Sequence, residues 1–307
     1  MRRLMRFRRR CEVLLACALC LSSTVTFARD RTGRCDQALA NVPSRPSFAP
    51  TGSEFVRQIQ SIGETEREEA IEAELLSGDI PAFLTRLIPV ELDGNGASVT
   101  LCVAPDYLAV GSDKDFLFVP MRLSTALRVA QRYGAVLPTV RIVDAVYEQA
   151  DLRLAPQPLP PTDRMRSTAY YSEHNALVRK QREARGGGLG ELTAGDKKDL
   201  VLTERLWRMS DRVAIYGWHR GKHDPIQPLS TVHGARYADY SHGVRLVATR
   251  AYVNGEPKSL LALLGDPRLA TLVNSEGPIA QLLDLIAKLE VPPPESGVKT
   301  AGASNTR

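Results

Sequence analysis

Four of the five histidines in this chain fall within 24 residues, between Gly217 and Arg245. Tyrosine and aspartate are interspersed with them. Imidazole gains and loses a proton near neutral pH, and a neighbouring carboxylate can orient it. The stretch joins the end of one predicted strand to the start of the next, and rigid scaffolds usually display reactive groups on such loops. The sequence therefore predicts a functional site here.

A metal site is one form that this prediction takes. Catalytic zinc commonly keeps three protein ligands, among them imidazole and carboxylate, and one open position. His233, Asp239 and His242 form the best trio of ligands, and His219 would replace one of them or act as a base. The spacing matches no zinc motif, and no His-Glu-x-x-His sequence occurs. One divalent metal ion, zinc, is therefore the only candidate cofactor.

The same stretch also suits acid–base chemistry without a metal. Tyr237 or Tyr240 would donate or accept a proton, and Arg245 would bind a carboxylate or stabilise developing negative charge. This set fits hydrolysis or elimination on an acidic polysaccharide or a peptide. A serine triad built on Ser230 or Ser241 is disfavoured, because no nucleophile-elbow pattern is present.

Hydrogen-bonded scaffolding between two strands is the competing explanation of these residues. His223 lies in an expected exposed turn and is left out of the site, and Lys198 joins it if its strand neighbours the loop. The charged run that contains Lys198 is otherwise a solvated turn. The predicted catalytic residues are His219, His233, Asp239, Tyr240, His242 and Arg245; the predicted substrate-binding residues are Trp218, Gln227, Tyr237 and Lys198; the candidate metal ligands are His233, Asp239 and His242.

A secretory signal peptide is predicted at residues 1–28. Six arginines precede an apolar run of about 15 residues, which is shorter than the ~20 that cross a bilayer comfortably. A small residue, Ala28, stands at the exit before polar sequence resumes. We therefore expect a periplasmic or secreted protein. No later stretch is apolar enough to span a membrane, so no stable span is expected after cleavage.

Removing the predicted signal changes both the charge and the cysteine count. It takes six of the 40 Lys and Arg and one of the 35 Asp and Glu, which leaves 34 of each sign. A nucleic-acid partner requires a basic face, so the neutral remainder argues against that class. Of five cysteines only Cys35 and Cys102 remain, and in an oxidising compartment they are expected to form one disulfide.

The rest of the chain predicts an α+β fold, with a mostly antiparallel sheet flanked by helices and a helical N-terminal region. Residues 29–52 are expected to form an extended arm, and residues 53–290 a single domain. Its halves are a helix-rich 53–155 and a sheet half, 164–290, that carries the histidine loop. Residues 291–307 are predicted to be a disordered tail. Helices are expected at 64–76, 80–87, 123–133, 140–150, 259–264, 267–273 and 278–289, and strands at 99–103, 116–119, 199–203, 212–218 and 244–249.

Three functions follow from these observations, in order of preference. The first is an exported hydrolase of a cell-envelope or extracellular polymer, either peptidoglycan peptide or polysaccharide, with or without a metal in the His/Asp/His loop. The second is a metal-free glycosidase or polysaccharide lyase that uses His, Tyr and Arg. The third is a periplasmic binding or assembly protein without chemistry.

Overall fold

The computed structural model describes residues 35, 39 and 41–291, so the predicted signal peptide, part of the arm and the tail after Val291 lie outside the described residues. Within the described part the fold is α+β with mostly antiparallel sheets, as predicted. None of the helices described there has the length and apolar character needed to cross a bilayer.

The larger sheet is built from hairpins. Strands β1 (Ile88–Gly94) and β2 (Ala97–Val103) are antiparallel and meet at Asn95-Gly96, where both residues have positive φ. Asn-Gly is the typical sequence of such a two-residue turn. Strands β12 (Val247–Val253) and β13 (Glu256–Ser259) form the second hairpin, and the order is β1-β2-β12-β13 with β5 (Ala135–Val136) also paired to β12.

The smaller sheet carries the histidine-rich stretch, in the order β10-β9-β8-β11. Strands β8 (Lys198–Leu200) and β9 (Ile215–Gly221) are antiparallel, and β11 (His242–Gly243) pairs with β8 in parallel. The histidine-rich stretch therefore folds back so that its last histidine lies beside β8.

Part of the expected loop is a strand instead. Strand β10 (Asp224–Ser230) pairs with β9 as an antiparallel hairpin. Its two prolines make the sequence resemble a loop. They are tolerated because β10 is an edge strand, where a residue without an N–H breaks no ladder hydrogen bond on the solvent side. Two further strand pairs are short. They are β3 (Ala109–Ser112) with β4 (Asp115–Phe118), antiparallel, and β6 (Leu152–Arg153) with β7 (Thr193–Ala194), parallel.

The helices begin and end where the local sequence dictates. Thr51 and Glu54 form a reciprocal capping box at the first of them, and Gly78 ends the second with φ 91°. The expected helices at 80–87 and 267–273 are only short 3-10 turns, η1 (Ala82–Thr85) and η4 (Ala270–Leu272). The α-helices are α2 (Gly52–Ile59), α3 (Glu64–Ser77), α4 (Leu123–Arg132), α5 (Val140–Gln149), α6 (Thr168–Ala184), α7 (Leu260–Gly265) and α8 (Leu282–Glu290).

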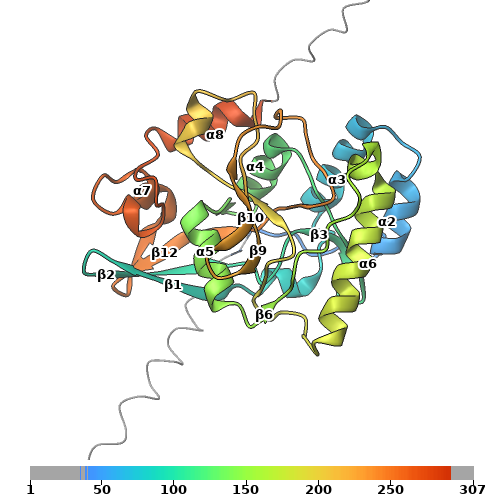
Figure 1. The fold of residues 1–307 in the computed structure, drawn as a ribbon, viewed down its shortest axis with the longest axis horizontal. Coiled ribbons are helices and arrows are strands. Elements are labelled where there is room, and N and C mark those ends of the chain that lie inside the picture. Colours follow the sequence, from blue (N-terminus) through green and yellow to red (C-terminus); the bar gives the residue numbers. More distant parts are fainter. Residues whose placement is uncertain (1–34, 36–38, 40, 292–307) are drawn as a thin grey trace, which may run out of the picture.

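The helices surround the strands on several sides. In Figure 1, α2, α3 and α6 group on one side of the molecule, α5 lies against β9, and α7 and α8 lie at the opposite end. Cys35 and Cys102 are disulfide-bonded, as predicted, which ties the arm to the buried strand β2. One cluster of buried apolar side chains includes Phe55, Val103, Ile215 and Leu289 and so contains residues from both halves of the chain.

Candidate functional site

Asp239 and His242 form a buried pair in the turn that leads into β11. Each side chain is no more than 1% exposed, and His242 Nε2 lies 3.9 Å from Asp239 Oδ2. The hydroxyl of Tyr237 donates to Asp239 Oδ2 at 2.9 Å. The backbone N–H and hydroxyl of Ser241 both donate to Asp239 Oδ1, at 2.8 and 2.5 Å. Ser241 therefore holds the aspartate and is not hydrogen-bonded to a histidine as a triad serine would be.

Asp239 is charged and His242 is neutral at neutral pH, because of the pKa that the buried site gives to each of them. Burial alone would raise the pKa of Asp239, but His242 and the hydrogen bonds from Ser241 lower it to about 2. Burial lowers the pKa of His242 to about 4. At neutral pH a charged carboxylate therefore lies beside a neutral imidazole. Neither ring nitrogen of His242 has a hydrogen-bond partner among the described residues.

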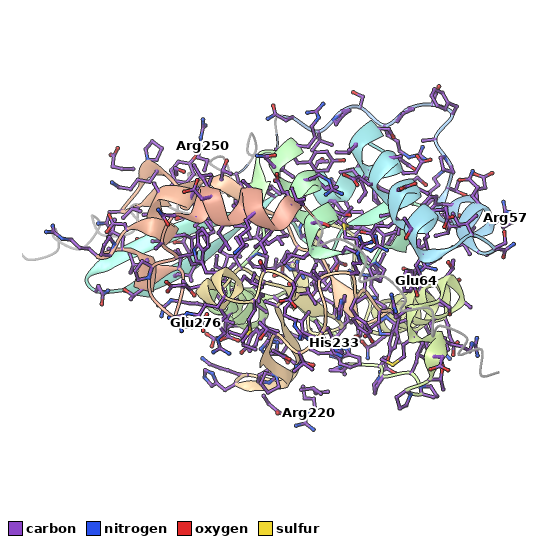
Figure 2. The ribbon with its side chains drawn as sticks, turned by 90° about the horizontal axis from the view of Figure 1, so that it is seen from above. Arg57, Glu64, Arg220, His233, Arg250 and Glu276 are labelled. Carbon is purple, nitrogen blue, oxygen red and sulfur yellow. A yellow bond between two sulfur atoms is a disulfide. The ribbon has the colours of Figure 1, made fainter. Side chains whose placement is uncertain are left out.

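His233 and Tyr237 form a partly exposed layer over this pair. Their rings are parallel within 8°, with centroids 4.0 Å apart. The ring of His242 lies 6.3 Å from His233 and 5.7 Å from Tyr237, centroid to centroid. Partial burial lowers the pKa of His233, although Asp239 acts in the opposite direction. His233 is therefore a neutral imidazole within reach of solvent at neutral pH. Figure 2 labels His233, and below it Arg220 projects from the β9–β10 hairpin.

Lys198 and Trp218 complete this group, which we call the histidine cluster: His233, Tyr237, Asp239, His242, Lys198 and Trp218. Lys198 pairs in register with Gly217 on β9 and with His242 on β11, so it stands between them. Its ammonium lies 4.9 Å from the centroid of the Trp218 ring. Burial lowers the pKa of Lys198, against the influence of Asp239.

Trp218 is unusual in two respects. Its φ is 57°, a left-handed conformation that is a genuine outlier for a bulky side chain. Its side chain is buried, yet its indole N–H has no partner among the described residues. Strained backbone and unsatisfied polar groups concentrate at functional sites, so both features support a role for this residue.

His219 belongs to a different group, although the sequence places it beside Trp218. Its Nε2 lies 3.1 Å from Asp144 Oδ1 on α5, and the hydroxyl of Tyr216 donates to the same oxygen at 2.7 Å. The imidazole stacks on Tyr147 with centroids 4.6 Å apart. The structure therefore places His219 against α5, and its recorded ring contacts are with Tyr147 and Tyr216, not with the histidine cluster.

Tyr240 and Arg245, two predicted catalytic residues, are buried in structural roles. The Tyr240 hydroxyl accepts from the backbone N–H of Leu159 at 2.8 Å. Arg245 is 1% exposed and donates to the carbonyl oxygens of Ala104 and Thr193, at 2.9 and 2.7 Å. These contacts explain both residues without a substrate.

Two residues of the β9–β10 hairpin also lie apart from the cluster. The side chain of Gln227, a predicted substrate-binding residue, donates to the carbonyl of its neighbour Pro228 at 2.9 Å. His223 is exposed at the turn, with φ 60°, which agrees with its omission from the site. The stiff loop expected around Gln227 is part of β10.

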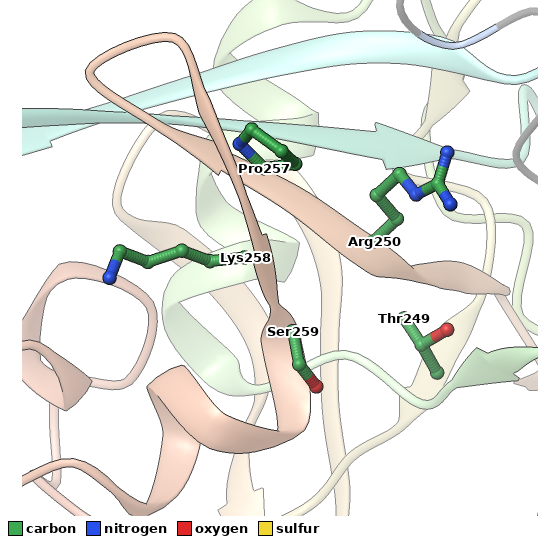
Figure 3. A pocket seen from close by; sticks show the side chains of 5 residues that line it. All are labelled: Thr249, Arg250, Pro257, Lys258 and Ser259. Carbon is green, nitrogen blue, oxygen red and sulfur yellow. The ribbon is translucent and has the colours of Figure 1, made fainter.

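Four cavities lined by described residues lie outside the histidine cluster. The largest, about 410 Å³, lies between β1 and α5 and is lined by Asp144 and His223 among others. Another, about 310 Å³, lies at the β12–β13 hairpin beside Arg250 and Lys258 (Figure 3). No residue of the cluster lines any of these four. The cluster therefore does not open into any of these four cavities.

The candidate metal ligands are neighbours but do not converge on one point. Among the described residues, no group of three His, Cys, Asp or Glu side chains is placed to hold a metal ion. His233 faces the ring of Tyr237, and the hydroxyl of that tyrosine occupies Asp239 Oδ2. The geometry fits acid–base chemistry more directly than metal coordination.

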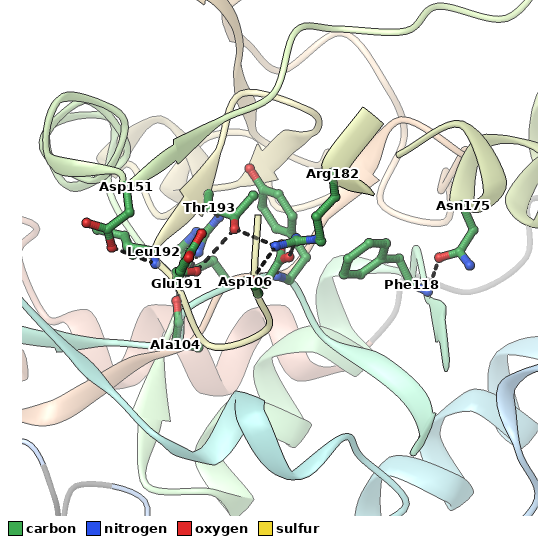
Figure 4. Close-up of polar contacts among 12 residues, drawn as sticks. Ala104, Asp106, Phe118, Asp151, Asn175, Arg182, Glu191, Leu192 and Thr193 are labelled. Atoms are coloured by element: carbon green, nitrogen blue, oxygen red, sulfur yellow. Dashed lines mark hydrogen bonds and ion pairs between the residues drawn. The ribbon is translucent and has the colours of Figure 1, made fainter. Parts of the chain in front are cut away.

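A buried ionic network behind the cluster was missed in the sequence. Lys197 Nζ lies 3.0 Å from His174 Nδ1, and Arg182 forms a buried ion pair with Asp106 (Figure 4). Burial raises the pKa of Asp196 to about 7, and neither of its carboxylate oxygens has a partner among the described residues. The expectation of a solvated turn fails here because Asp196, Lys197 and Asp199 of this run are buried.

Comparison of the chain with protein families, with curated proteins and with solved structures finds no match.

Proposed function

We propose that this protein is an exported hydrolase of a cell-envelope or extracellular polymer, and that the histidine cluster is its reactive centre. One observation carries the proposal. A charged Asp239 and a neutral, unpartnered His242 are buried directly beneath a partly exposed His233 and Tyr237. Burying the polar imidazole of His242 without a partner costs free energy, which a purely structural loop does not require.

His233 is the general base of this proposal. It is partly exposed, and its lowered pKa keeps it neutral at physiological pH, so it can take a proton from an attacking water molecule. Tyr237 fixes the plane of that imidazole by stacking. Tyr237 is not the base itself, because burial and Asp239 raise its pKa well above the usual range of a tyrosine hydroxyl.

Asp239 organises the centre. It accepts the Tyr237 hydroxyl, which fixes the ring on which His233 stacks, and its negative charge favours the protonated form of both His233 and His242. An imidazolium that forms during reaction is therefore stabilised by a carboxylate already in place. Lys198, on the neighbouring strand, supplies positive charge for the leaving group or the developing oxyanion.

A polymeric substrate fits the shape of this region. Two partly exposed groups, the stacked rings of His233 and Tyr237, lie side by side above the buried pair. A chain that lies across the surface reaches such groups, whereas a small metabolite is usually enclosed in a pocket. The predicted signal peptide directs the protein to the compartment where such polymers occur.

The metal-dependent form of the proposal uses the same residues. His233, Asp239 and His242 would be the ligands, after rearrangement of the ring stack that now engages His233. The second function, a metal-free glycosidase or lyase, shares the cluster and differs in product, because a lyase leaves an unsaturated sugar. The third, a non-catalytic binding protein, predicts affinity without turnover.

The experiment is an assay of purified protein on peptidoglycan and on acidic polysaccharides, following released peptide termini, reducing ends and unsaturated products. We expect release without unsaturated products, and its loss in His242→Gln. His223→Gln is the matched control, because His223 is an exposed histidine of the same stretch. Unchanged turnover in His242→Gln, or no turnover on any polymer, would refute the proposal.

A further inference from the structure

Two hydrogen-bond donors of the histidine cluster have no partner among the described residues. They are the indole N–H of Trp218 and the single N–H of the neutral His242 imidazole, whose other ring nitrogen is an acceptor. The Lys198 ammonium lies over the face of the Trp218 ring, 4.9 Å from its centroid. These residues stand on β9, β11 and β8, and β8 lies between the other two strands.

Buried donors without an acceptor destabilise the folded protein. Trp218 and His242 are 5% and 1% exposed, so water reaches their nitrogens poorly. A buried donor without an acceptor has lost its hydrogen bonds to water without replacing them, and the loss is larger for a charged donor. The strained φ of Trp218 adds to that cost and holds the indole beside the lysine. An arrangement of this kind is complete only with an acceptor bound to it.

From these donors we propose that Lys198, Trp218 and His242 bind a carboxylate of the substrate. The inference rests on the proposed function, since it specifies the substrate of the same site. A carboxylate offers two oxygens and a negative charge, and so satisfies an ammonium together with an indole or imidazole N–H. It also favours the protonated form of Lys198, against the burial that lowers the pKa of that lysine.

The charges around the site select an anion over a cation. The nearby carboxylate of Asp239 is already occupied, because Tyr237 and Ser241 donate to its two oxygens. Arg166 lies nearby, with its guanidinium 5.4 Å from the Tyr237 ring centroid, and its charge is already paired with Glu64. The carboxylate would come from an acidic sugar or from the end of a peptide.

The test uses Trp218 as its own reporter. The chain holds two tryptophans, so a Trp207→Phe background leaves Trp218 as the single fluorophore. This protein is titrated at pH 7 with galacturonate trimer and with alanyl-alanine, against their neutral counterparts, galactose trimer and alanyl-alanine amide. Calorimetry on the same mixtures measures binding independently of fluorescence.

We expect saturable binding of one acid and at least about tenfold weaker binding of its neutral counterpart, which is the worth of one charge-assisted hydrogen bond. Which acid binds identifies the source of the carboxylate. Lys198→Gln should weaken binding by a similar factor. Lys258→Gln, an exposed lysine on β13, should leave it unchanged.

Equal affinity for acid and neutral probes, equal affinity in Lys198→Gln, or no binding of either acid by both methods would overturn the carboxylate site. Carboxylate binding without polymer turnover would instead refute only the proposed hydrolase. Turnover that is indifferent to the carboxylate would leave the hydrolase standing and refute this inference alone.

Discussion

The ring of His233 lies parallel to that of Tyr237, 4.0 Å away, while the hydroxyl of Tyr237 is held by Asp239. A partly exposed imidazole is thereby positioned by a fully buried carboxylate through one intervening side chain. The arrangement gives each of the three residues a distinct role: His233 meets the substrate, Tyr237 positions His233, and Asp239 positions Tyr237.

The two tyrosines of the loop should therefore behave differently when their hydroxyls are removed. Tyr237→Phe breaks the bond to Asp239 and should lower activity about tenfold, because the base loses its positioning. Tyr240→Phe breaks only a bond to the backbone of Leu159 and should cost about 1 kcal/mol of stability with activity retained. Steady-state kinetics and thermal melts on both variants measure this, and the opposite ranking of activities would contradict the assigned roles.

The disulfide should be a major source of stability. Cys35 and Cys102 are separated by 67 residues, and in the chain-entropy treatment a loop of that size is worth about 4 kcal/mol. Cys35→Ser with Cys102→Ser should lower the melting temperature markedly, and a reducing agent should lower that of the natural protein but not of the double variant. A melting temperature insensitive to both changes would show that the bond contributes little.

Asp196 should make stability fall as pH rises. Burial raises its pKa from 3.8 to about 7, so between these values the folded protein binds a proton that the unfolded chain lacks. Its contribution is therefore greatest below pH 3.8 and is lost as pH rises through 7. Asp196→Asn removes this dependence, and the melting temperature of the variant relative to the natural protein should rise by at least about 2 °C from pH 5 to pH 8.

Asp284→Asn is the control for this measurement, since Asp284 is exposed on α8. Its difference from the natural protein should be the same at both pH values. A pH-independent difference for Asp196→Asn would mean that the buried carboxyl is ionised throughout.

Metal removal should leave the activity intact. The described His, Cys, Asp and Glu side chains include no group of three placed to hold an ion. We therefore expect substoichiometric metal in purified protein and full turnover after treatment with a chelator. Loss of activity on chelation, restored by zinc, would favour the metal-dependent form of the centre.

Local sequence patterns were sufficient to predict much of the fold. Helices α3, α4 and α5 begin at their predicted residues and end within one residue of their predicted ends. Strand β10 was missed because Pro225 and Pro228 suggest a loop, and only its edge position explains why they are tolerated. Strand β1 was missed for a similar reason, since Pro89 interrupts its pattern.

The candidate site was predictable only in part. Clustering in sequence brought attention to His233, Tyr237, Asp239 and His242, which do lie together. It could not separate His219 from them, because β9 turns that side chain toward Asp144 on α5. Partners that are distant in sequence decide such cases, as they also do for the structural roles of Tyr240 and Arg245.

The most direct test of the central claim compares single Gln substitutions of the four histidines in one stretch, assayed on the same polymer at equal folded concentration. His233 and His242 belong to the histidine cluster, His219 contacts Asp144, and His223 is exposed. We predict that the first two substitutions lower kcat/KM by about 100-fold or more, while the other two change it by no more than about threefold. Activity that survives loss of His233 and His242 but falls with His219 would contradict it.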